Sequence, residues 1–132
     1  MNLMILDGIY AIYKYKVETP LPRWIRSSDL YSITKTRDEL SVVAIQNDRM
    51  LKDVFINRDW RIIKIEGPLD FSLVGIIADI SAVFKKRQIP IFTLSTYDTD
   101  YVLVKQNDLY AGIQALKESG YNVLQENKKA PY

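Results

Sequence analysis

One stretch of this 132-residue chain occurs twice, and the repetition limits what the chain can fold into. Residues 31–43 (YSITKTRDELSVV) align without a gap with residues 92–104 (FTLSTYDTDYVLV), 61 positions later. The tripeptide Gln-Asn-Asp follows each copy, at residues 46–48 and 106–108. A repeat of this length indicates one small structural unit used twice. Binding sites are then expected at the seams, where loops of the two units face each other.

The length and composition indicate an ordinary globular protein. Two units of about 60 residues each are near the lower limit for independent folding, so we expect them to share a sheet or an interface. The composition is 48% hydrophobic and 26% charged, which argues against disorder. The net charge of +2 is small and the Lys and Arg residues are scattered. No nucleic-acid partner and no membrane surface is therefore expected.

The chain lacks the residues that most often carry catalysis and metal binding. It contains no Cys and no His, which removes thiolate nucleophiles, disulfides and the commonest general base and metal ligand. The longest apolar stretch, residues 73–84, is interrupted by Asp79 and is too short to span a membrane. We expect a cytoplasmic protein that is not an enzyme, with no catalytic residues, no metal and no cofactor.

Hydrophobic periodicity predicts strands and two helices. The clearest helix covers residues 72–87, where apolar side chains recur at helical spacing, and Asp70 is a candidate N-cap. Asn107 or Asp108 is expected to cap a helix that ends at Gly120, and residues 47–52 are expected to form a short helical turn. Strands are expected at residues 9–16, 31–36, 40–46, 54–56, 60–66, 91–96, 101–105 and 121–125.

The order of these elements predicts an α+β fold. Residues 60–132 give the order βαββαβ, which is that of the ferredoxin-like arrangement: an antiparallel sheet with both helices on one face. Residues 1–59 carry the same hairpin. Their first crossover, Val17 to Leu30, contains prolines that exclude a long helix. We therefore expect two tandem ferredoxin-like units, 1–59 and 60–132, with a trimmed first helix in the first unit.

Three runs resemble the ACT domain, a small-molecule sensing module. They are residues 38–43 (DELSVV), 66–75 (EGPLDFSLVG) and 95–101 (STYDTDY), and they are similar to runs in small stand-alone bacterial tandem-ACT proteins. The units of the animal cytosolic arginine sensor are also similar, and the resemblance covers about Ile5 to Val123. It implies a regulatory protein that binds an amino acid or a similar small molecule, forms a homodimer and acts on a downstream protein partner.

The same resemblance implies a ligand site. In ACT domains the ligand lies where the first helix, and the loop after it, meet a neighbouring unit. The corresponding residues are Asp70, Phe71 and Ser72 at the helix start, Gln88, Ile89, Pro90 and Ile91 in the loop, and Asp98 and Asp100 from the facing unit. Free amides at the first two places would hold a ligand carboxylate, and the aspartates would hold its ammonium group.

Two alternatives remain open. Many ACT domains carry Gly and Ser where this chain has Gln88 and Pro90, and proline has no amide to donate. This difference favours a ligand-free scaffold that only dimerises through its sheet edges or helices. In addition, Asp70 has a purely structural interpretation as an N-cap, and Asp98 and Asp100 have one as turn residues.

Overall fold

The computed structural model describes residues 1–49, 51–66 and 74–126, and it divides the chain into two compact units. The N-terminal unit is Gly8–Trp60, and the C-terminal unit is Arg61–Tyr132 together with Met1–Asp7. The sequence had suggested 1–59 and 60–132. The boundary in the middle of the chain differs by one residue, but the first seven residues belong to the C-terminal unit, because residues 2–5 form a strand of its sheet.

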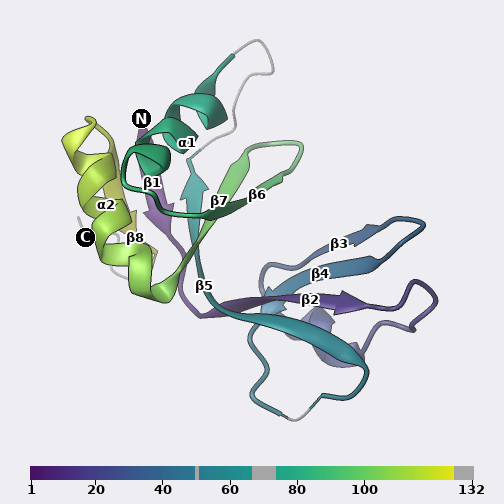
Figure 1. Cartoon of the computed structure of the whole chain (residues 1–132). Coiled ribbons are helices and arrows are strands. Elements are labelled where there is room, and N and C mark those ends of the chain that lie inside the picture. The colour runs from purple at the N-terminus through teal and green to yellow at the C-terminus, as the bar shows by residue number, and fades with distance from the viewer. Residues whose placement is uncertain (50, 67–73, 127–132) are drawn as a thin grey trace. The chain divides into compact units, whose positions relative to one another are not determined.

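The N-terminal unit is a four-stranded antiparallel sheet (Figure 1). Its strands lie in the order β3-β4-β2-β5, which is the strand order of a ferredoxin-like unit. A five-residue 3-10 helix replaces the first helix, as the prolines predicted. The elements are β2 (Tyr10–Tyr15), η1 (Arg23–Ser27), β3 (Ser32–Lys35), β4 (Leu40–Ile45) and the first part of β5 (Val54–Ile65).

Alternation along β2 places the core of this unit on one side of the sheet. Ala11, Tyr13 and Tyr15 are buried while Lys14 is exposed, as expected for successive side chains of a strand. The Tyr13 ring stacks on Tyr15 at 6.4 Å and meets the edge of Trp24, which lies in η1, at 5.3 Å. The short 3-10 helix therefore covers the sheet with aromatic side chains in place of a full helix.

The C-terminal unit contains both α-helices. Its strands lie in the order β6-β7-β5-β1-β8, with the N-terminal strand β1 inserted between β5 and β8 (Figure 1). Strand β1 is antiparallel to β5 and parallel to β8. The elements are β1 (Asn2–Ile5), the second part of β5, α1 (Ile76–Lys86), β6 (Ile91–Ser95), β7 (Asp100–Lys105), η2 (Gln106–Asp108), α2 (Leu109–Glu118) and β8 (Asn122–Gln125).

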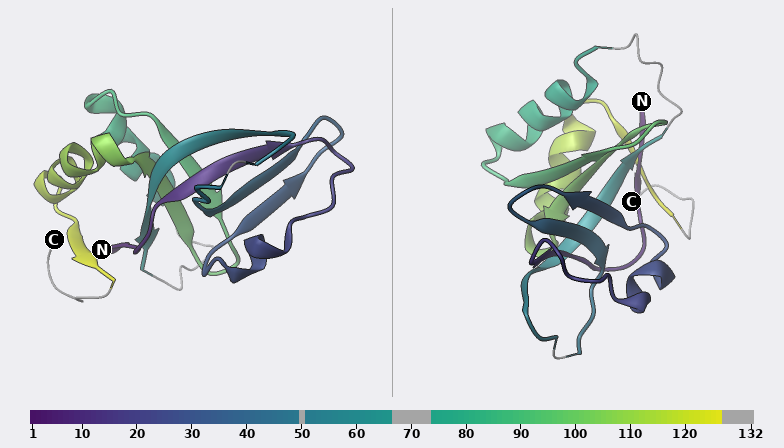
Figure 2. Two further views of the ribbon diagram at one scale, coloured as in Figure 1. Left: turned by 90° about the horizontal axis from the view of Figure 1, so that it is seen from below. Right: turned by 90° about the vertical axis from the view of Figure 1, so that its right-hand side faces the viewer.

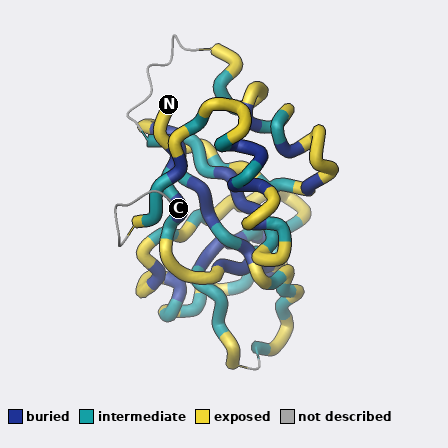
Figure 3. Tube along the Cα trace, turned by 90° about the vertical axis from the view of Figure 1, so that its left-hand side faces the viewer, coloured by how far each residue is buried: buried dark blue, intermediate teal, exposed yellow. Residues whose placement is uncertain are grey.

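Side chains from both helices and four strands form the core of the C-terminal unit. Phe84 of α1 lies against Gly112 of α2, where an added Cβ would stand 2.8 Å from the Phe84 ring, so the glycine allows close helix packing. Figure 2 shows the two helices beside each other, and Figure 3 shows buried stretches in the strands and exposed turns. The core residues include Leu3, Ile5, Ile63, Ile65, Ile80, Phe84, Val102, Val104, Ile113 and Leu116.

The structure confirms the α+β ferredoxin-like class and corrects several elements. Helix α1 begins at Ile76, because Gly75 has a φ of 79° in the left-handed region and is the N-cap. Asp70 and Ser72, the predicted cap and helix start, lie outside the described residues. The strands predicted at residues 54–56 and 60–66 are parts of the single strand β5, which ends at Ile65. The strand β1 was not predicted.

The short helical turn predicted at residues 47–52 is not found in the described part of this segment. Within the described residues 46–49 and 51–53 there is no helix. Instead, the Asn47 side chain accepts a hydrogen bond from the Arg49 amide at 2.9 Å, which makes a local turn. Helix α2 begins at Leu109 as expected and has Asp108 at its N-cap, but that side chain makes no capping hydrogen bond. Gly120, with a φ of 95°, follows the end of the helix as expected.

The two hairpins match each other at a spacing of 60 residues, not 61. Ser32 pairs with Val43 in β3–β4, and Phe92 pairs with Leu103 in β6–β7. The turns agree as well, since the Thr36 amide donates to the Glu39 carbonyl at 2.9 Å and the Thr96 amide to the Thr99 carbonyl at 2.8 Å. A shift of one residue would place every matched side chain on the opposite face. The 60-residue spacing also aligns the two Gln-Asn-Asp tripeptides.

Candidate ligand-binding site

The loop after α1 is held by hydrogen bonds to the helix itself. The Gln88 amide donates to the Lys85 carbonyl at 3.0 Å, and the Ile89 amide donates to the Phe84 carbonyl at 3.1 Å. Gln88 has a φ of 56°, and Ile89 is buried in the core with Phe84. Together these features form a Schellman motif, with glutamine in the left-handed position that glycine usually occupies.

This motif leaves few amides in the loop for a ligand carboxylate. The amides of Gln88 and Ile89 are already bonded, and Pro90 has none. Ile91 begins strand β6, where it pairs with Val104. Gln88 and Pro90 are exposed, whereas the Ile89 side chain packs in the core. In this conformation the loop offers an exposed side-chain amide at Gln88, but neither of its first two backbone amides.

The turn between β6 and β7 carries the two predicted aspartates. Asp98 is exposed at the tip, and the Asp100 carboxylate accepts a hydrogen bond from the Ser95 hydroxyl at 2.5 Å. Thr99, between them, is 4% exposed, and its hydroxyl donates to the Ile65 carbonyl at the end of β5. Sequence reasoning missed the role of Thr99. Its hydroxyl links the turn to the end of strand β5.

Within one copy of the chain, the predicted residues do not form one group. Strand β6 separates the loop 88–91 from the turn 96–99, and its five residues span about 13 to 17 Å. Asp98 and Asp100 lie at the end of the hairpin near Ile65, whereas Gln88 to Ile91 lie at the opposite end. Asp70, Phe71 and Ser72 lie outside the described residues. A site that used both ends would need a second copy of the chain.

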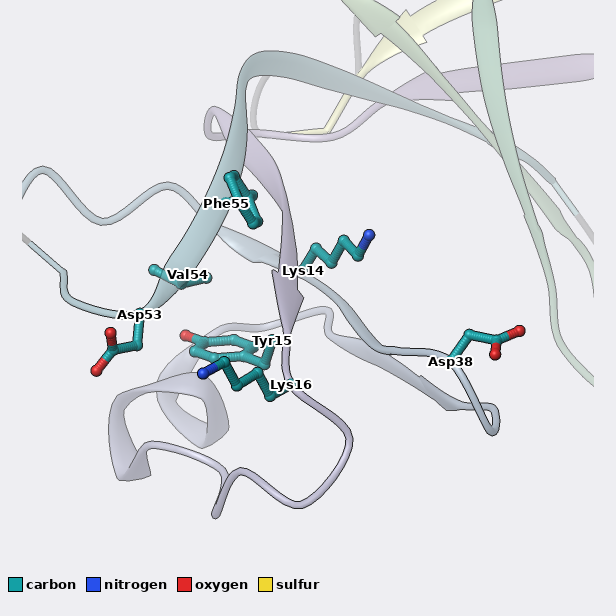
Figure 4. Close-up of a pocket in the computed structure, with 7 residues that line it drawn as sticks. All are labelled: Lys14, Tyr15, Lys16, Asp38, Asp53, Val54 and Phe55. Atoms are coloured by element: carbon teal, nitrogen blue, oxygen red, sulfur yellow. The ribbon is translucent and has the colours of Figure 1, made fainter.

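The structure also contains a pocket that the sequence did not indicate. This pocket, called here the β2–β5 pocket, has a volume of about 430 Å³ and lies entirely in the N-terminal unit (Figure 4). It forms where β2 ends and β5 begins, because Tyr15 pairs with Val54 and Lys14 with Phe55. Its lining residues are Lys14, Tyr15, Lys16, Asp38, Asp53, Val54 and Phe55.

Tyr15 is the most unusual residue of this pocket. It is 5% exposed, and its buried hydroxyl has no hydrogen-bond partner among the described residues. Burial raises the pKa of the Tyr15 hydroxyl above its usual 10.0, and the neighbouring Tyr13 adds to the effect. The hydroxyl therefore stays protonated at neutral pH and is a hydrogen-bond donor without an acceptor. The alternation of Tyr and Lys along residues 13–16 predicted the strand but not this unpaired group.

Other features of the described residues do not indicate a catalytic site or a metal site. A hollow of about 350 Å³ beside α1 and α2 is lined partly by Arg87 and Glu118, which form an exposed ion pair at 2.5 Å. No group of three or more Asp or Glu residues in the described part of the chain is arranged to hold a metal ion. None of the described helices is long and apolar enough to cross a membrane.

Comparison with known proteins identifies the domain. Residues 55–118 match the model of the ACT domain, and residues 8–50 match the model of a family described as an N-terminal domain. An X-ray structure of a protein from Agrobacterium tumefaciens is 34% identical, with 99% of this chain and 97% of that chain covered and a TM-score of 0.86. The chain belongs to the same family as that protein, and its residues 55–118 match an ACT domain. More distant structures share the fold.

Two of these structures show how widely the fold of this ACT-domain protein occurs. The regulatory subunit of aspartate kinase from Thermus thermophilus is 11% identical, with 86% of this chain and 93% of that chain covered and a TM-score of 0.60. A Vibrio cholerae protein described as a possible transport protein is 15% identical, with coverage of 89% and 88% and a TM-score of 0.66. At these identities the likeness concerns the fold alone.

Proposed function

We propose that this ACT-domain protein is a non-catalytic, cytoplasmic regulator that binds an amino acid and transmits the binding event to a protein partner. The observation that carries the proposal is the ACT domain at residues 55–118, in a fold shared with the regulatory subunit of an aspartate kinase. We further propose that the two units are tandem copies of one ACT unit, related to those of the animal arginine sensor. The matching hairpin registers support this duplication.

The proposed ligand site joins two copies of the chain. The segment Asp70–Ser72 and the loop Gln88–Ile91 would come from one copy, and the aspartates at 98 and 100 from the other. Asp98 is exposed and Asp100 is half-buried, so both carboxylates are open to a ligand ammonium group. Because the turn and the loop lie at opposite ends of β6, this site requires a homodimer. Light scattering at micromolar concentration tests for that dimer, and a monomer would contradict the proposal.

A thermal-shift screen of the twenty amino acids tests ligand binding. A ligand present at 100 times its Kd stabilises the folded state by about 2.7 kcal/mol, which corresponds to a Tm shift on the order of 10 °C. Asp100→Asn should remove the shift and leave the Tm of the free protein nearly unchanged, because the amide still accepts from Ser95. If Asp100→Asn lowers the Tm equally with and without ligand, Asp100 belongs to the turn alone.

One observation favours a second function, a ligand-free dimerisation scaffold. The amides of Gln88 and Ile89 are bonded to α1, and Pro90 has no amide, so the loop lacks its usual donors for a carboxylate. A scaffold would show a dimer by light scattering and no Tm shift with any of the twenty amino acids. A ligand-dependent Tm shift would instead support the regulatory function.

A further inference from the structure

The outer side of β8 is an unprotected sheet edge. In the C-terminal unit β8 lies at the end of the strand order, where it pairs only with β1 among the described strands. Its four residues, Asn122–Gln125, include no charged residue and no proline, and their register with β1 has no bulge. Folded proteins normally protect an exposed edge with a charge, a proline or a bulge. Two other edge strands follow that rule, since β3 ends at Lys35 and β6 begins directly after Pro90.

Two residues of β8 direct their backbone groups away from β1. The amides of Asn122 and Glu126 donate to carbonyls of the N-terminal segment that contains β1, at 3.2 and 3.0 Å. Alternate residues of a strand direct their amide and carbonyl groups to opposite sides, so Val123 and Gln125 face outward. These outward groups have no hydrogen-bond partner among the described residues. A row of free donors and acceptors of this kind is suited to pairing with another strand.

A second copy of β8 matches this edge. When two copies run antiparallel with Leu124 opposite Leu124, Val123 of each copy lies opposite Gln125 of the other. Both outward-facing residues of each copy then exchange amide-to-carbonyl hydrogen bonds, and the arrangement has the two-fold symmetry of a closed dimer. A register centred on Val123 would instead set Gln125 opposite Tyr121, whose amide is already bonded to the Leu116 carbonyl at 3.1 Å. The backbone therefore favours the register centred on Leu124.

The side chains agree with this register. Leu124 is half-buried and would cover its own counterpart at the two-fold axis. Asn122 would lie opposite Glu126 of the second copy, so no like charges would face each other within residues 122–126. A hollow of about 480 Å³, lined in part by Tyr121, lies beside the first half of β8 and leaves room for the approaching strand.

We propose that two copies of the chain associate through their β8 strands, which pair antiparallel around Leu124 and join the two C-terminal sheets into one. This interface goes beyond the proposed function. The described residues of the proposed ligand site lie at the two ends of β6, which is at the opposite edge of the C-terminal sheet, so the β8 pairing does not build that site. A strand this short makes a small interface, so the dimer is weak and dissociates readily.

Cysteine cross-linking tests the register, because the chain contains no cysteine of its own. In the proposed pairing the two copies of residue 124 have Cα atoms about 4.5 Å apart, within reach of a disulfide. The two copies of residue 122 are about 13 Å apart along the strand. Leu124→Cys should therefore form a disulfide-linked dimer under mild oxidation, and the matched control Asn122→Cys should remain largely monomeric on a non-reducing gel. Equal cross-linking of both variants, or none in Leu124→Cys, would overturn the proposal.

Charge variants test the interface without a cross-link. Leu124→Lys places two lysines opposite each other at the two-fold axis, so it should weaken association at least tenfold in sedimentation equilibrium. Asn122→Lys is the matched control, because its lysine would face Glu126 of the second copy and association should not weaken. A monomeric wild type at millimolar concentration, or wild-type association in Leu124→Lys, would contradict the interface. If Leu124→Lys does not fold, the cross-linking result decides alone.

The outcomes separate this interface from the proposed ligand site. If Leu124→Cys cross-links and no amino acid shifts the Tm of the wild type, the β8 interface stands and the ligand site fails. If an amino acid shifts the Tm and the wild type is a dimer, but Leu124→Cys does not cross-link, the ligand site stands and the β8 interface is wrong.

Discussion

The amide of Ile89 donates to the carbonyl of Phe84 across 3.1 Å, and both side chains lie in the same core. This relationship ends helix α1 and fixes the start of β6. It requires a left-handed residue between the helix and Ile89, and that residue is Gln88, with a φ of 56°. In the structure, glutamine itself occupies a conformation suited to glycine.

Gln88→Gly should therefore stabilise the protein by about 1 kcal/mol, because glycine adopts the left-handed region without the steric cost that a Cβ brings. Urea unfolding at neutral pH measures the difference. Gly120→Ala is the matched control, since Gly120 has a φ of 95° and open space around its Cβ position, and it should lose about 1 kcal/mol. A destabilised Gln88→Gly variant would contradict the argument.

The repeated hairpin shows what the sequence could and could not predict. Its strands and turns were predicted correctly, because turn residues and alternating apolar residues are local signals. The predicted spacing was wrong by one residue. A comparison of sequences counts pairs such as Ser with Thr, or Val with Leu, as matches, and such pairs also occur in the wrong register. The backbone register decides the matter: Thr36 and Thr96 make the same turn, and Val42 and Val102 are both fully buried.

Gly112→Ala should destabilise the protein although alanine favours helices. The substitution gains about 1 kcal/mol of helix propensity. The added methyl group, however, would stand 2.8 Å from the ring of Phe84, which is 1% exposed and has no room to move. Overpacking of this kind costs about 1–3 kcal/mol, so we expect a net loss of about 1 kcal/mol in urea unfolding.

A double-mutant cycle tests the cause of that loss. Phe84→Leu removes the ring and destabilises the protein by itself, but in its presence Gly112→Ala should cost less or become favourable. If the two effects simply add, the loss in Gly112→Ala does not come from the contact with Phe84.

Thr99→Val should cost about 1–3 kcal/mol, because the buried Thr99 hydroxyl donates to the Ile65 carbonyl and valine leaves that acceptor unpaired. Thr99→Ser keeps the hydroxyl and should recover most of the stability in the same unfolding experiment. The matched position in the other hairpin is Glu39, which is half-buried at the surface, and Glu39→Val should stay within about 0.5 kcal/mol of wild type. Equal losses at the two positions would assign the effect to β-turn propensity.

The parts of the molecule that sequence reasoning missed depend on contacts between distant residues. Strand β1 has too few residues for a clear periodic signal, and its place between β5 and β8 follows from pairing with residues about 60 and 120 positions away. The unpaired hydroxyl of Tyr15 is likewise invisible in the sequence, because only the packing of the N-terminal unit removes it from water. Local patterns do not report such long-range burial.

Buried tyrosines should make the protein sensitive to alkaline pH. Burial raises the pKa values of Tyr13, Tyr15 and Tyr121 above 10.0 in the folded state, whereas in the unfolded chain they are expected near 10. Between these two values the unfolded state binds fewer protons than the folded state, so the free energy of unfolding falls as pH rises. Below about pH 10 this contribution is fully present, and it is lost progressively above that pH.

Tyr13→Phe separates the hydrogen bonding of Tyr13 from its contribution to the pH dependence. The Tyr13 hydroxyl donates to the Ile45 carbonyl and accepts from the Asn47 amide, each at 2.9 Å. Losing both hydrogen bonds should lower stability at pH 7 by about 1–3 kcal/mol. The variant should also lose less stability than wild type between pH 9 and pH 11, since one raised pKa is gone. Urea midpoints across this range give both quantities. Tyr110→Phe, at a tyrosine that is 71% exposed, should follow the wild-type curve, and a wild-type slope in Tyr13→Phe would show that Tyr13 does not contribute to the alkaline loss.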